Sequence, residues 1–499
     1  MTISIINVAR QSLKFSVIQI IGTVITMAVS IYVGRILTPE EYGVYGFLGL
    51  WLSYAALISP GIINAGSREM PGLLGKGEVA KAVRIQNVAL TSELIWALIP
   101  FAVIFVASFF FQDSVTRTGM MIIAFSYLTL RITNMFSSMN YIREKFNTVA
   151  IGNLILALGV PIIIVISVYW LKVYALLIAP LSVNIILLFY YLKKGPIGYR
   201  FQTDRGEIGR LLKIGIVLQA GSLIYWAYQL MDRTLIASFL SQEQLGLYTY
   251  AIGFVTVALN LPISFTNVLQ PILWRTAHGA DSIKEGFKDA KRIAVYLALG
   301  TTMLIPLAQL GFYDVVNWIT PKYIGSIPVL HVLSYNICLA ALVVIPNLVL
   351  NSAIVNKQKV VLLFYAVGLV INIALNILII KLGYGIVGVA WVMIGSQALV
   401  TLAMYCYAQR YMFADTKEYL HLQVKILLPF VVSIGFFFLH QYLETSYGIK
   451  AFTGISIAAQ IVVWGVLIRI FYRDYLSAKE IKALIARAKE GMRARKTAD

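Results

Sequence analysis

The amino-acid sequence predicts an all-α integral membrane protein with about 14 transmembrane helices: two six-helix lobes plus two C-terminal helices. Of its 499 residues, 59% are hydrophobic and 13% are charged, which is not the composition of a soluble globular chain. Apolar runs of about 20 residues recur from end to end, and each is long enough to span a bilayer. A short motif also occurs twice, each time between two such runs. Composition, run length and repeat together predict this fold class.

The repeated motif occupies residues 34–46 and 237–249, and each copy is typical of a tight turn that joins two membrane helices. Four residue pairs are identical at one fixed spacing: Leu37 and Leu240, Glu40 and Glu243, Gly43 and Gly246, and Tyr45 and Tyr248. Residues 38–41 and 241–244 both form a capping box, which satisfies backbone donors at a helix start. Two copies that run in the same direction predict a pseudo-two-fold axis along the membrane normal, with a cavity between the lobes.

The first half of the chain contains six expected helices. They fall near residues 13–35, 42–66, 86–111, 118–138, 148–170 and 173–192. The second helix ends in a segment rich in Pro and Gly, residues 60–69, which is too irregular for a straight helix and delivers Arg68 near the cytoplasmic face. We therefore expect an N-lobe over residues 1–192, followed by a basic cytoplasmic linker over residues 193–210.

The second half repeats this plan and adds two helices. Its expected helices fall near residues 211–240, 245–269, 293–312, 325–351, 360–382, 386–410, 424–442 and 452–471, and the last two have no counterpart in the first half. We expect a cytoplasmic amphipathic helix over residues 274–292. These elements define a C-lobe at 211–410 and two further helices within 411–472. The basic cytoplasmic tail at 473–499 either lies on the inner leaflet or forms a solvated helix.

The net charge of +19 is distributed asymmetrically. With the N-terminus inside, most of the 41 Lys and Arg residues fall in segments on the cytoplasmic side. The opposite loops hold only a few: Arg35, Arg117, Lys172, Lys322, Lys381 and Lys450. This asymmetry follows the positive-inside rule and predicts a multi-pass protein of the cell (inner) membrane with both termini cytoplasmic. The charge therefore indicates contact with anionic membrane lipid and requires no nucleic acid.

Other function classes lack the residues that they need. Cys338, Cys406 and the four scattered histidines have no spacing for a disulfide or a metal site. Residues 383–388 match GxGxxG, yet they join two expected membrane helices, whereas a dinucleotide site follows a strand. The loops opposite the cytoplasm are short and their acids are explained by capping, which leaves a membrane glycosyltransferase or polymerase as a weak alternative. We expect no catalytic residue, no metal and no organic cofactor.

Charged residues inside the membrane are the candidate functional residues, because they are costly and usually face a cavity or a partner. Asp232 and Arg233 lie within one expected helix. Arg233 is a candidate contact for an anionic headgroup, and Asp232 is a candidate coupling site for Na⁺ or H⁺; the alternative is that both form structural ion pairs. Glu93 and Arg131 either pair with each other or act on a substrate, and Glu93 is a second candidate for ion coupling.

Four further cations flank the expected cavity. Arg35 and Arg68 lie at opposite faces, where they either contact an anion at the two mouths or snorkel to the interface. Arg68 is favoured because the Gly-rich segment before it is typical of backbone that lines a cavity. Arg10 and Lys14 either ring the cytoplasmic entrance or anchor the first helix.

Several motifs resemble those of one known family. Residues 34–45 read Gly-Arg-x-Leu-Thr-Pro-Glu-Glu-Tyr-Gly-x-Tyr, residues 61–68 read Gly-x-x-Asn-Ala-x-x-Arg, and residues 232–240 read Asp-Arg-x-Leu-Ile-x-x-Phe-Leu. Residues 321–330 and 376–388 are similar as well. Together these motifs resemble the polysaccharide-export family of O-antigen flippases (Wzx-type). That family belongs to the superfamily that also holds the MATE drug exporters and the lipid II flippases.

The resemblance implies a transporter and not an enzyme. It implies alternating access that carries a polyprenyl (pyro)phosphate-linked oligosaccharide from the cytoplasmic to the outer leaflet, for surface polysaccharide such as lipopolysaccharide. Arg68 and Arg233 occupy matching motif positions as headgroup contacts, Arg35 follows more weakly, and relatives couple to Na⁺ or H⁺. Other polysaccharide-assembly proteins are possible partners. The alternative is a MATE-like exporter of cationic small molecules, whose cavity would be dominated by acidic and aromatic side chains.

Overall fold

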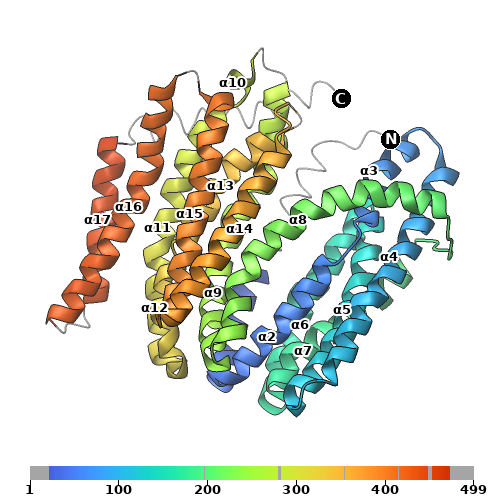
Figure 1. The fold of residues 1–499 in the computed structure, drawn as a ribbon, viewed down its shortest axis with the longest axis horizontal. Coiled ribbons are helices and arrows are strands. Elements are labelled where there is room, and N and C mark those ends of the chain that lie inside the picture. Colours follow the sequence, from blue (N-terminus) through green and yellow to red (C-terminus); the bar gives the residue numbers. More distant parts are fainter. Residues whose placement is uncertain are drawn as a thin grey trace.

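The computed structural model describes residues 22–195, 197–278, 282–352, 354–413, 415–447 and 452–471. Within these ranges every regular element is a helix, and the helices form two bundles that meet at one end (Figure 1). The expected all-α membrane fold is confirmed. Arg10, Lys14 and the expected tail at 473–499 lie outside the described residues.

The first bundle begins with a helix at Gly22–Ile36. It continues with α2 (Pro39–Leu57), α3 (Ile62–Gly75), α4 (Val79–Ser108), α5 (Ser114–Ile142), α6 (Phe146–Leu171) and α7 (Val173–Lys194). The predicted interruption at the Pro60-Gly61 segment is confirmed, because α2 and α3 meet at an angle of 48°. Gly61 has a φ of 70°, in the left-handed region that a residue without a Cβ adopts readily.

The second bundle contains the remaining elements. They are α8 (Arg205–Phe239), α9 (Gln242–His278), α10 (Ile283–Gly286), α11 (Lys288–Trp318), η1 (Pro321–Ser326), α12 (Ile327–Leu333), α13 (Asn336–Asn351), α14 (Gln358–Lys381), α15 (Gly385–Met412), α16 (Thr416–Tyr447) and α17 (Phe452–Phe471). One expectation was wrong. The separate amphipathic helix at 274–292 does not form, since α9 runs on to His278, α10 covers only Ile283–Gly286 and α11 starts at Lys288. The membrane helix expected at 325–351 is confirmed, because Pro321–Asn351 forms one candidate span, although its helical pattern changes at η1 and between α12 and α13.

The expected count of about 14 membrane-spanning helices is not confirmed within the described residues. Nine helices there are long and apolar enough to cross a bilayer, or up to 11 if each bent pair counts as one span. A shorter apolar helix, Gly22–Ile36, precedes them. Large apolar side chains such as Val106, Ile166 and Phe189 are exposed on these helices, as expected for surfaces that face lipid.

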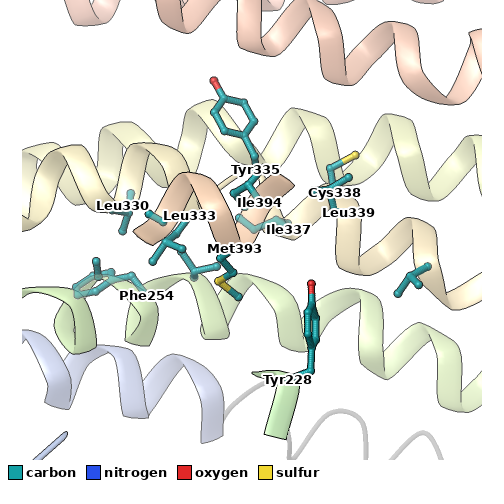
Figure 2. Close-up of a cluster of buried hydrophobic side chains, with 14 of the residues drawn as sticks. Tyr228, Phe254, Leu330, Leu333, Tyr335, Ile337, Cys338, Leu339, Met393 and Ile394 are labelled. Carbon is teal, nitrogen blue, oxygen red and sulfur yellow. The ribbon is translucent and has the colours of Figure 1, made fainter. Parts of the chain in front are cut away.

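The second bundle packs around a continuous apolar core. Figure 2 shows Met393 of α15 lying between Tyr228 of α8 and the buried residues of α12 and α13. Cys338 belongs to this core, and a second cluster buries one side of α3 against α4 and α5. α16 packs on α11 and α17 on α16, so the two extra helices lie on the outside of this bundle (Figure 1).

Candidate functional site

The two copies of the repeated motif meet at one end of the molecule, which we name the Thr38 end. Here α2 packs along α9. A Cβ atom on Gly43 would overlap the Gln242 carbonyl, and one on Gly246 would overlap the Pro39 carbonyl. Two helices approach this closely only where side chains are absent. The repeated glycines therefore mark a symmetric contact between the two bundles.

A segment of the second bundle closes the same end. Lys322 Nζ of η1 donates to the carbonyl oxygens of Arg35 and Ile36 at 3.1 and 3.2 Å, and the Tyr323 hydroxyl donates to the Leu37 carbonyl at 3.2 Å. These carbonyls belong to the last turn of the first helix, where backbone acceptors have no partner within the helix and attract a cation. Lys322 and Tyr323 thus cap a helix of the other bundle.

Three tyrosines fill the space behind this cap. The rings of Tyr250 and Tyr323 lie 4.1 Å apart between centroids, and Tyr42 meets them edge-on at 5.6 and 6.0 Å. All three side chains are buried. Buried, mutually packed aromatic rings exclude water. In this conformation the Thr38 end is sealed.

The opposite end, which we name the Arg205 end, is held by polar contacts. Arg210 of α8 makes a bidentate ion pair with Glu69 of α3 at 2.6 and 2.7 Å. Asp204, the N-cap of α8, pairs with Arg84 of α4. The Arg84 guanidinium and the backbone donors of the α8 start lower the pKa of the Asp204 carboxyl. The first part of α8 therefore lies on the first bundle (Figure 1).

α8 is bent in its middle, as the α2–α3 pair is. Its two parts, Arg205–Ile216 and Gln219–Phe239, meet at 44°. Gly61 and Gly215 touch through their backbones, since a Cβ atom on Gly215 would lie 2.6 Å from the Gly61 carbonyl carbon. The bends of the two bundles thus pack against each other.

A polar cavity of about 290 Å³ lies at these bends, between the two bundles. It is lined by Ser59, Gly61, Ile63, Asn64, Glu93, Arg131, Asn134, Met135, Ser137, Ser138 and Gln219. Gln219 belongs to α8, whereas the other lining residues belong to α3, α4, α5 and the segment before α3. The Gln219 amide donates to the Leu57 carbonyl at 3.2 Å, and the Asn64 amide donates to the Gln219 side-chain oxygen at 3.3 Å.

Glu93 and Arg131 form an ion pair in the wall of this cavity. The side chain of Glu93 is 1% exposed and that of Arg131 16% exposed. The Ser59 hydroxyl donates to Glu93 Oε1 at 3.0 Å. Glu93 Oε2 and Arg131 Nε are buried without a hydrogen-bond partner among the described residues. The pair adds no net charge, yet it leaves one acceptor and one donor unused.

Arg233 lies near the Thr38 end, between the two bundles. The preceding residue, Asp232, contacts Tyr248 of α9 in the second bundle. The Arg233 Nε atom is buried and has no hydrogen-bond partner among the described residues. The adjacent Thr234 hydroxyl is bonded to the Tyr54 hydroxyl of α2 at 2.7 Å, which fixes this part of α8 against the first bundle.

Asp232 contacts Tyr248 of α9 in the second bundle. It is 2% exposed and accepts a hydrogen bond from the Tyr248 hydroxyl, which also lies 3.8 Å from Met393 Sδ. A buried chain of polar side chains lies on the same side: Tyr228 to Ser396 at 3.0 Å, Asn372 to Ser396 at 3.0 Å, and Asn376 to Asn372 at 2.9 Å. Buried polar groups of this density are costly in a membrane and are typical of ion pathways.

The remaining predicted site residues are not brought together. Arg68 is an exposed residue of α3 and does not line the polar cavity. Arg35 is exposed at the Thr38 end, where its carbonyl binds Lys322. Their roles stay predictions, as do those of Arg10 and Lys14, which the structure does not describe.

Sequence reasoning missed most of the polar cavity. Asn134 and Ser138 follow Arg131 at intervals of three and four residues, so the three share one face of α5. That polar stripe in an otherwise apolar run could have been found from the sequence. Asn64 and Gln219 are far apart in the chain, and only the packing of α8 on α3 brings them together.

Comparisons with known proteins agree with this architecture. Residues 32–315 match the family described as polysaccharide biosynthesis protein. The fold is similar to that of the lipid II flippase MurJ in an inward closed conformation, with a TM-score of 0.68 and 14% identity over 92% of this chain and 99% of that chain.

Two multidrug transporters share the fold as well. One is an inward-facing multidrug resistance MATE family transporter of the MOP superfamily, with a TM-score of 0.61 and 12% identity over 78% of this chain and 94% of that one. The other is a mutant of the Vibrio cholerae MATE transporter VcmN, with a TM-score of 0.55 and 15% identity over 83% and 99%. No curated protein sequence matches the chain.

Proposed function

Because the chain belongs to the polysaccharide biosynthesis protein family, we propose that it translocates a polyprenyl (pyro)phosphate-linked oligosaccharide across the cell membrane by alternating access. The sealed Thr38 end faces outward in this proposal, since the distribution of Lys and Arg predicts that the Arg205 end is cytoplasmic. The product is a surface glycan such as an O-antigen, whose assembly involves further membrane proteins.

The observation that carries this proposal is the chemistry of the polar cavity. Its lining combines the hydroxyls of Ser59, Ser137 and Ser138 with the amides of Asn64, Asn134 and Gln219. Sugar hydroxyls both donate and accept hydrogen bonds, as these side chains do. A volume of about 290 Å³ lies near the lower limit of ligand pockets and suits one end of an oligosaccharide.

The charge of the cavity disfavours the main alternative, a MATE-like exporter of cations. A site for a cationic compound needs uncompensated negative charge, whereas the one acid in the lining, Glu93, is neutralised by Arg131. A neutral, hydrogen-bonding cavity fits a saccharide better than it fits a drug cation.

Arginine contacts for the phosphate groups complete the proposal. Arg233 has an unused buried donor between the bundles, which makes it the strongest of the predicted anion contacts. Arg68 and Arg35 are exposed at opposite ends and serve as further contacts during entry and release. Arg10 and Lys14 remain candidates for the cytoplasmic entrance on their sequence position alone.

Transport coupled to Na⁺ or H⁺ would require an acidic side chain that binds the ion in one conformation and releases it in the other. Asp232 is the better of the two predicted candidates, because it is buried and its side-chain contact is the neutral Tyr248 hydroxyl. Glu93 is already paired with Arg131. Substituting Asp232 by Asn should abolish stimulation of transport by an imposed Na⁺ or proton gradient while leaving substrate binding in place.

A flipping assay with purified protein in liposomes tests the proposed function. The probe is a fluorescent polyprenyl pyrophosphate-linked disaccharide, and the rate of its appearance in the outer leaflet is measured. Asn134→Leu should lower the initial rate about tenfold, because it removes hydrogen bonds from the cavity. Asn147→Leu, at an exposed position in the first turn of α6, is the matched control.

Native mass spectrometry provides a second, independent measurement. We expect the gently purified protein to retain a mass that fits a polyprenyl (pyro)phosphate with sugars, and Arg233→Ala to lose it. Retention of a small cationic compound together with unchanged flipping in Asn134→Leu would instead identify a drug exporter of the same fold.

A further inference from the structure

A second cavity, of about 600 Å³, lies inside the first bundle and is distinct from the polar cavity. It is bounded by the helix at Gly22–Ile36, α2, α6 and α7. It is lined by Gly22, Thr26, Val29, Ser30, Val33, Tyr42, Tyr45, Asn153, Leu156, Ala157, Val160, Pro161, Ile164, Leu176 and Pro180. None of these residues carries a charge. We name this space the N-lobe cavity.

Two of the hydroxyl side chains in the N-lobe cavity are bonded to the protein itself. The Thr26 hydroxyl donates to the Gly22 carbonyl at 2.8 Å, and the Ser30 hydroxyl is hydrogen-bonded to Tyr42. Such bonds leave mainly methyl and methylene groups to meet an occupant. An apolar cavity of this size in a membrane protein favours a hydrocarbon chain over a polar ligand.

The N-lobe cavity extends through about half of the membrane. Val33 lies in the last turn of the first helix, and Tyr42 and Leu176 lie in the first turns of α2 and α7, so one end of the cavity is at the Thr38 end. Gly22 lies 11 residues before Val33, which corresponds to about 16 Å along a helix. The hydrocarbon core of a bilayer is about 30 Å thick, so the cavity has the depth of one leaflet.

A cation lies near this cavity. Arg233 precedes Thr234, whose hydroxyl is bonded to Tyr54 of α2 at 2.7 Å, and α2 supplies Tyr42 and Tyr45 to the cavity lining. Arg233 Nε is buried and has no hydrogen-bond partner among the described residues. An uncharged cavity one leaflet deep with an arginine near it is complementary to an anionic lipid, because the chain can occupy the cavity while the phosphate contacts the guanidinium.

We propose that the N-lobe cavity holds the isoprenoid chain of the translocated lipid at the outer leaflet, while Arg233 contacts its phosphate. This inference rests on the proposed function and extends it to the lipid part of the substrate. It assigns the two parts of the substrate to two different binding positions along the transport route. The saccharide is held at the polar cavity near the Arg205 end, and the lipid is held near the Thr38 end before release.

Photolabelling of the full-length protein in lipid nanodiscs tests this assignment. The probe is a polyprenyl phosphate that carries a diazirine within its chain, and the labelled residues are mapped by peptide mass spectrometry. We expect labels on α6 and on the helix at Gly22–Ile36. Val160→Trp fills the cavity and should suppress this labelling. Ile162→Trp, two residues away and 55% exposed to lipid, should not change it.

The role of Arg233 is read from a comparison of two probes. Arg233→Ala should weaken labelling by the polyprenyl phosphate about tenfold and leave labelling by the corresponding uncharged polyprenol unchanged. Equal loss with both probes would overturn the phosphate contact, because it would indicate a general structural effect.

Other occupants give different results, and each overturns the inference. A diazirine-bearing phosphatidylglycerol that labels the same residues without competition from the polyprenyl phosphate would identify an ordinary membrane lipid. No label at these helices, with Val160→Trp flipping at the wild-type rate, would indicate an empty cavity or one filled by residues 1–21 of the chain. In that case the flipping assay still supports the proposed function. Absence of any flipping by the wild-type protein would contradict the proposed function itself.

Discussion

At the scale of single residues, the polar cavity depends on one buried ion pair. Glu93 and Arg131 lie on different helices, and each is a charge that the membrane interior disfavours. The pair satisfies the charges but not all of the hydrogen-bonding atoms, since Glu93 Oε2 and Arg131 Nε have no partner among the described residues. Both residues were predicted as candidate functional residues, because each is an isolated charge within an expected membrane helix. Their pairing was one of two alternatives, and only the packing of α4 on α5 decides between them.

Removal of one partner of this pair should be strongly destabilising. Arg131→Met leaves a buried carboxylate without its counter-charge, and the expected loss of unfolding free energy is about 3–5 kcal/mol. Glu93→Gln combined with Arg131→Met should recover much of that loss, because no buried charge remains. Thermal unfolding of the four proteins in detergent completes the double-mutant cycle. Additive losses would show that the two side chains do not interact.

The Asp204 carboxyl should give α8 a pH-dependent anchor on the first bundle. The pKa of Asp204 is lowered from 3.8, chiefly by Arg84, so its contribution to stability is fully present above the unfolded-state pKa of 3.8 and is lost as the pH falls through the lower folded-state value. Asp204→Asn keeps a side chain that caps α8 but removes the charge. Its thermal midpoint should lie below that of the wild type near pH 7, and the difference should shrink near pH 3.

The Arg84→Met variant checks the cause of this behaviour. It should show the same deficit near pH 7, and adding Asp204→Asn to it should have little further effect. A constant deficit at every pH would assign the effect to helix capping instead of the ion pair.

At the scale of elements, the repeated glycines determine how close α2 and α9 come. Both glycines were visible in the sequence as part of a repeated turn, and the capping boxes around them are confirmed. That the two copies contact each other could not be read from the sequence. The spacing of a repeat gives a symmetry axis, but it does not give the distance of the elements from that axis.

Gly246→Ala should weaken the contact between α2 and α9. The added methyl group would overlap the Pro39 carbonyl, and relief requires the helices to move apart, at a cost of about 1–3 kcal/mol. Gly253→Ala on the same helix has open space at its Cβ position and should be neutral or slightly stabilising. Thermal unfolding and backbone hydrogen exchange at the start of α2 measure the difference. Equal exchange in both variants would show that the contact is not tight in the membrane.

Interruptions of helices could be predicted where the local sequence contains Pro or Gly, but not where contacts with another helix cause them. The Pro60-Gly61 interruption was predicted correctly, because both residues disfavour a continuous helix locally. The local change of hydrogen-bond pattern between α12 and α13, at Ser334 and Tyr335, was not predicted. There the Gln309 amide of α11 donates to the His331 carbonyl at 3.1 Å and to the Ser334 hydroxyl at 2.9 Å. Because this feature is stabilised by side chains of another helix, the apolar sequence around it carries no local signal that predicts it.

At the scale of the whole molecule, the two ends are held in different ways. The two bundles are joined at the Thr38 end by glycines, tyrosines and a lysine on backbone carbonyls, whereas the ion pairs at the Arg205 end fix the first part of α8 on the first bundle. Alternating access requires that the contact at the Thr38 end can be released. The sequence predicted two lobes and an interior cavity, but not which end is sealed, since that depends on the relative stability of two packings.

Lys322 should control how often the Thr38 end opens. Its ammonium group binds two carbonyl oxygens of the first helix, and bonds to a charged group contribute more than neutral ones. Lys322→Met should therefore raise the population of the outward-open state. A cysteine introduced at Thr249, which is buried beside Gly46 at the contact between the bundles, should then be labelled about tenfold faster than in the protein with Lys322.

The measurement uses protein that lacks Cys338 and Cys406, and a thiol reagent that does not cross membranes. Lys381→Met, at an exposed lysine of the α14 end, is the control and should leave the rate unchanged. An unchanged rate in Lys322→Met would mean that the glycine contact and the buried tyrosines are sufficient to hold this end closed.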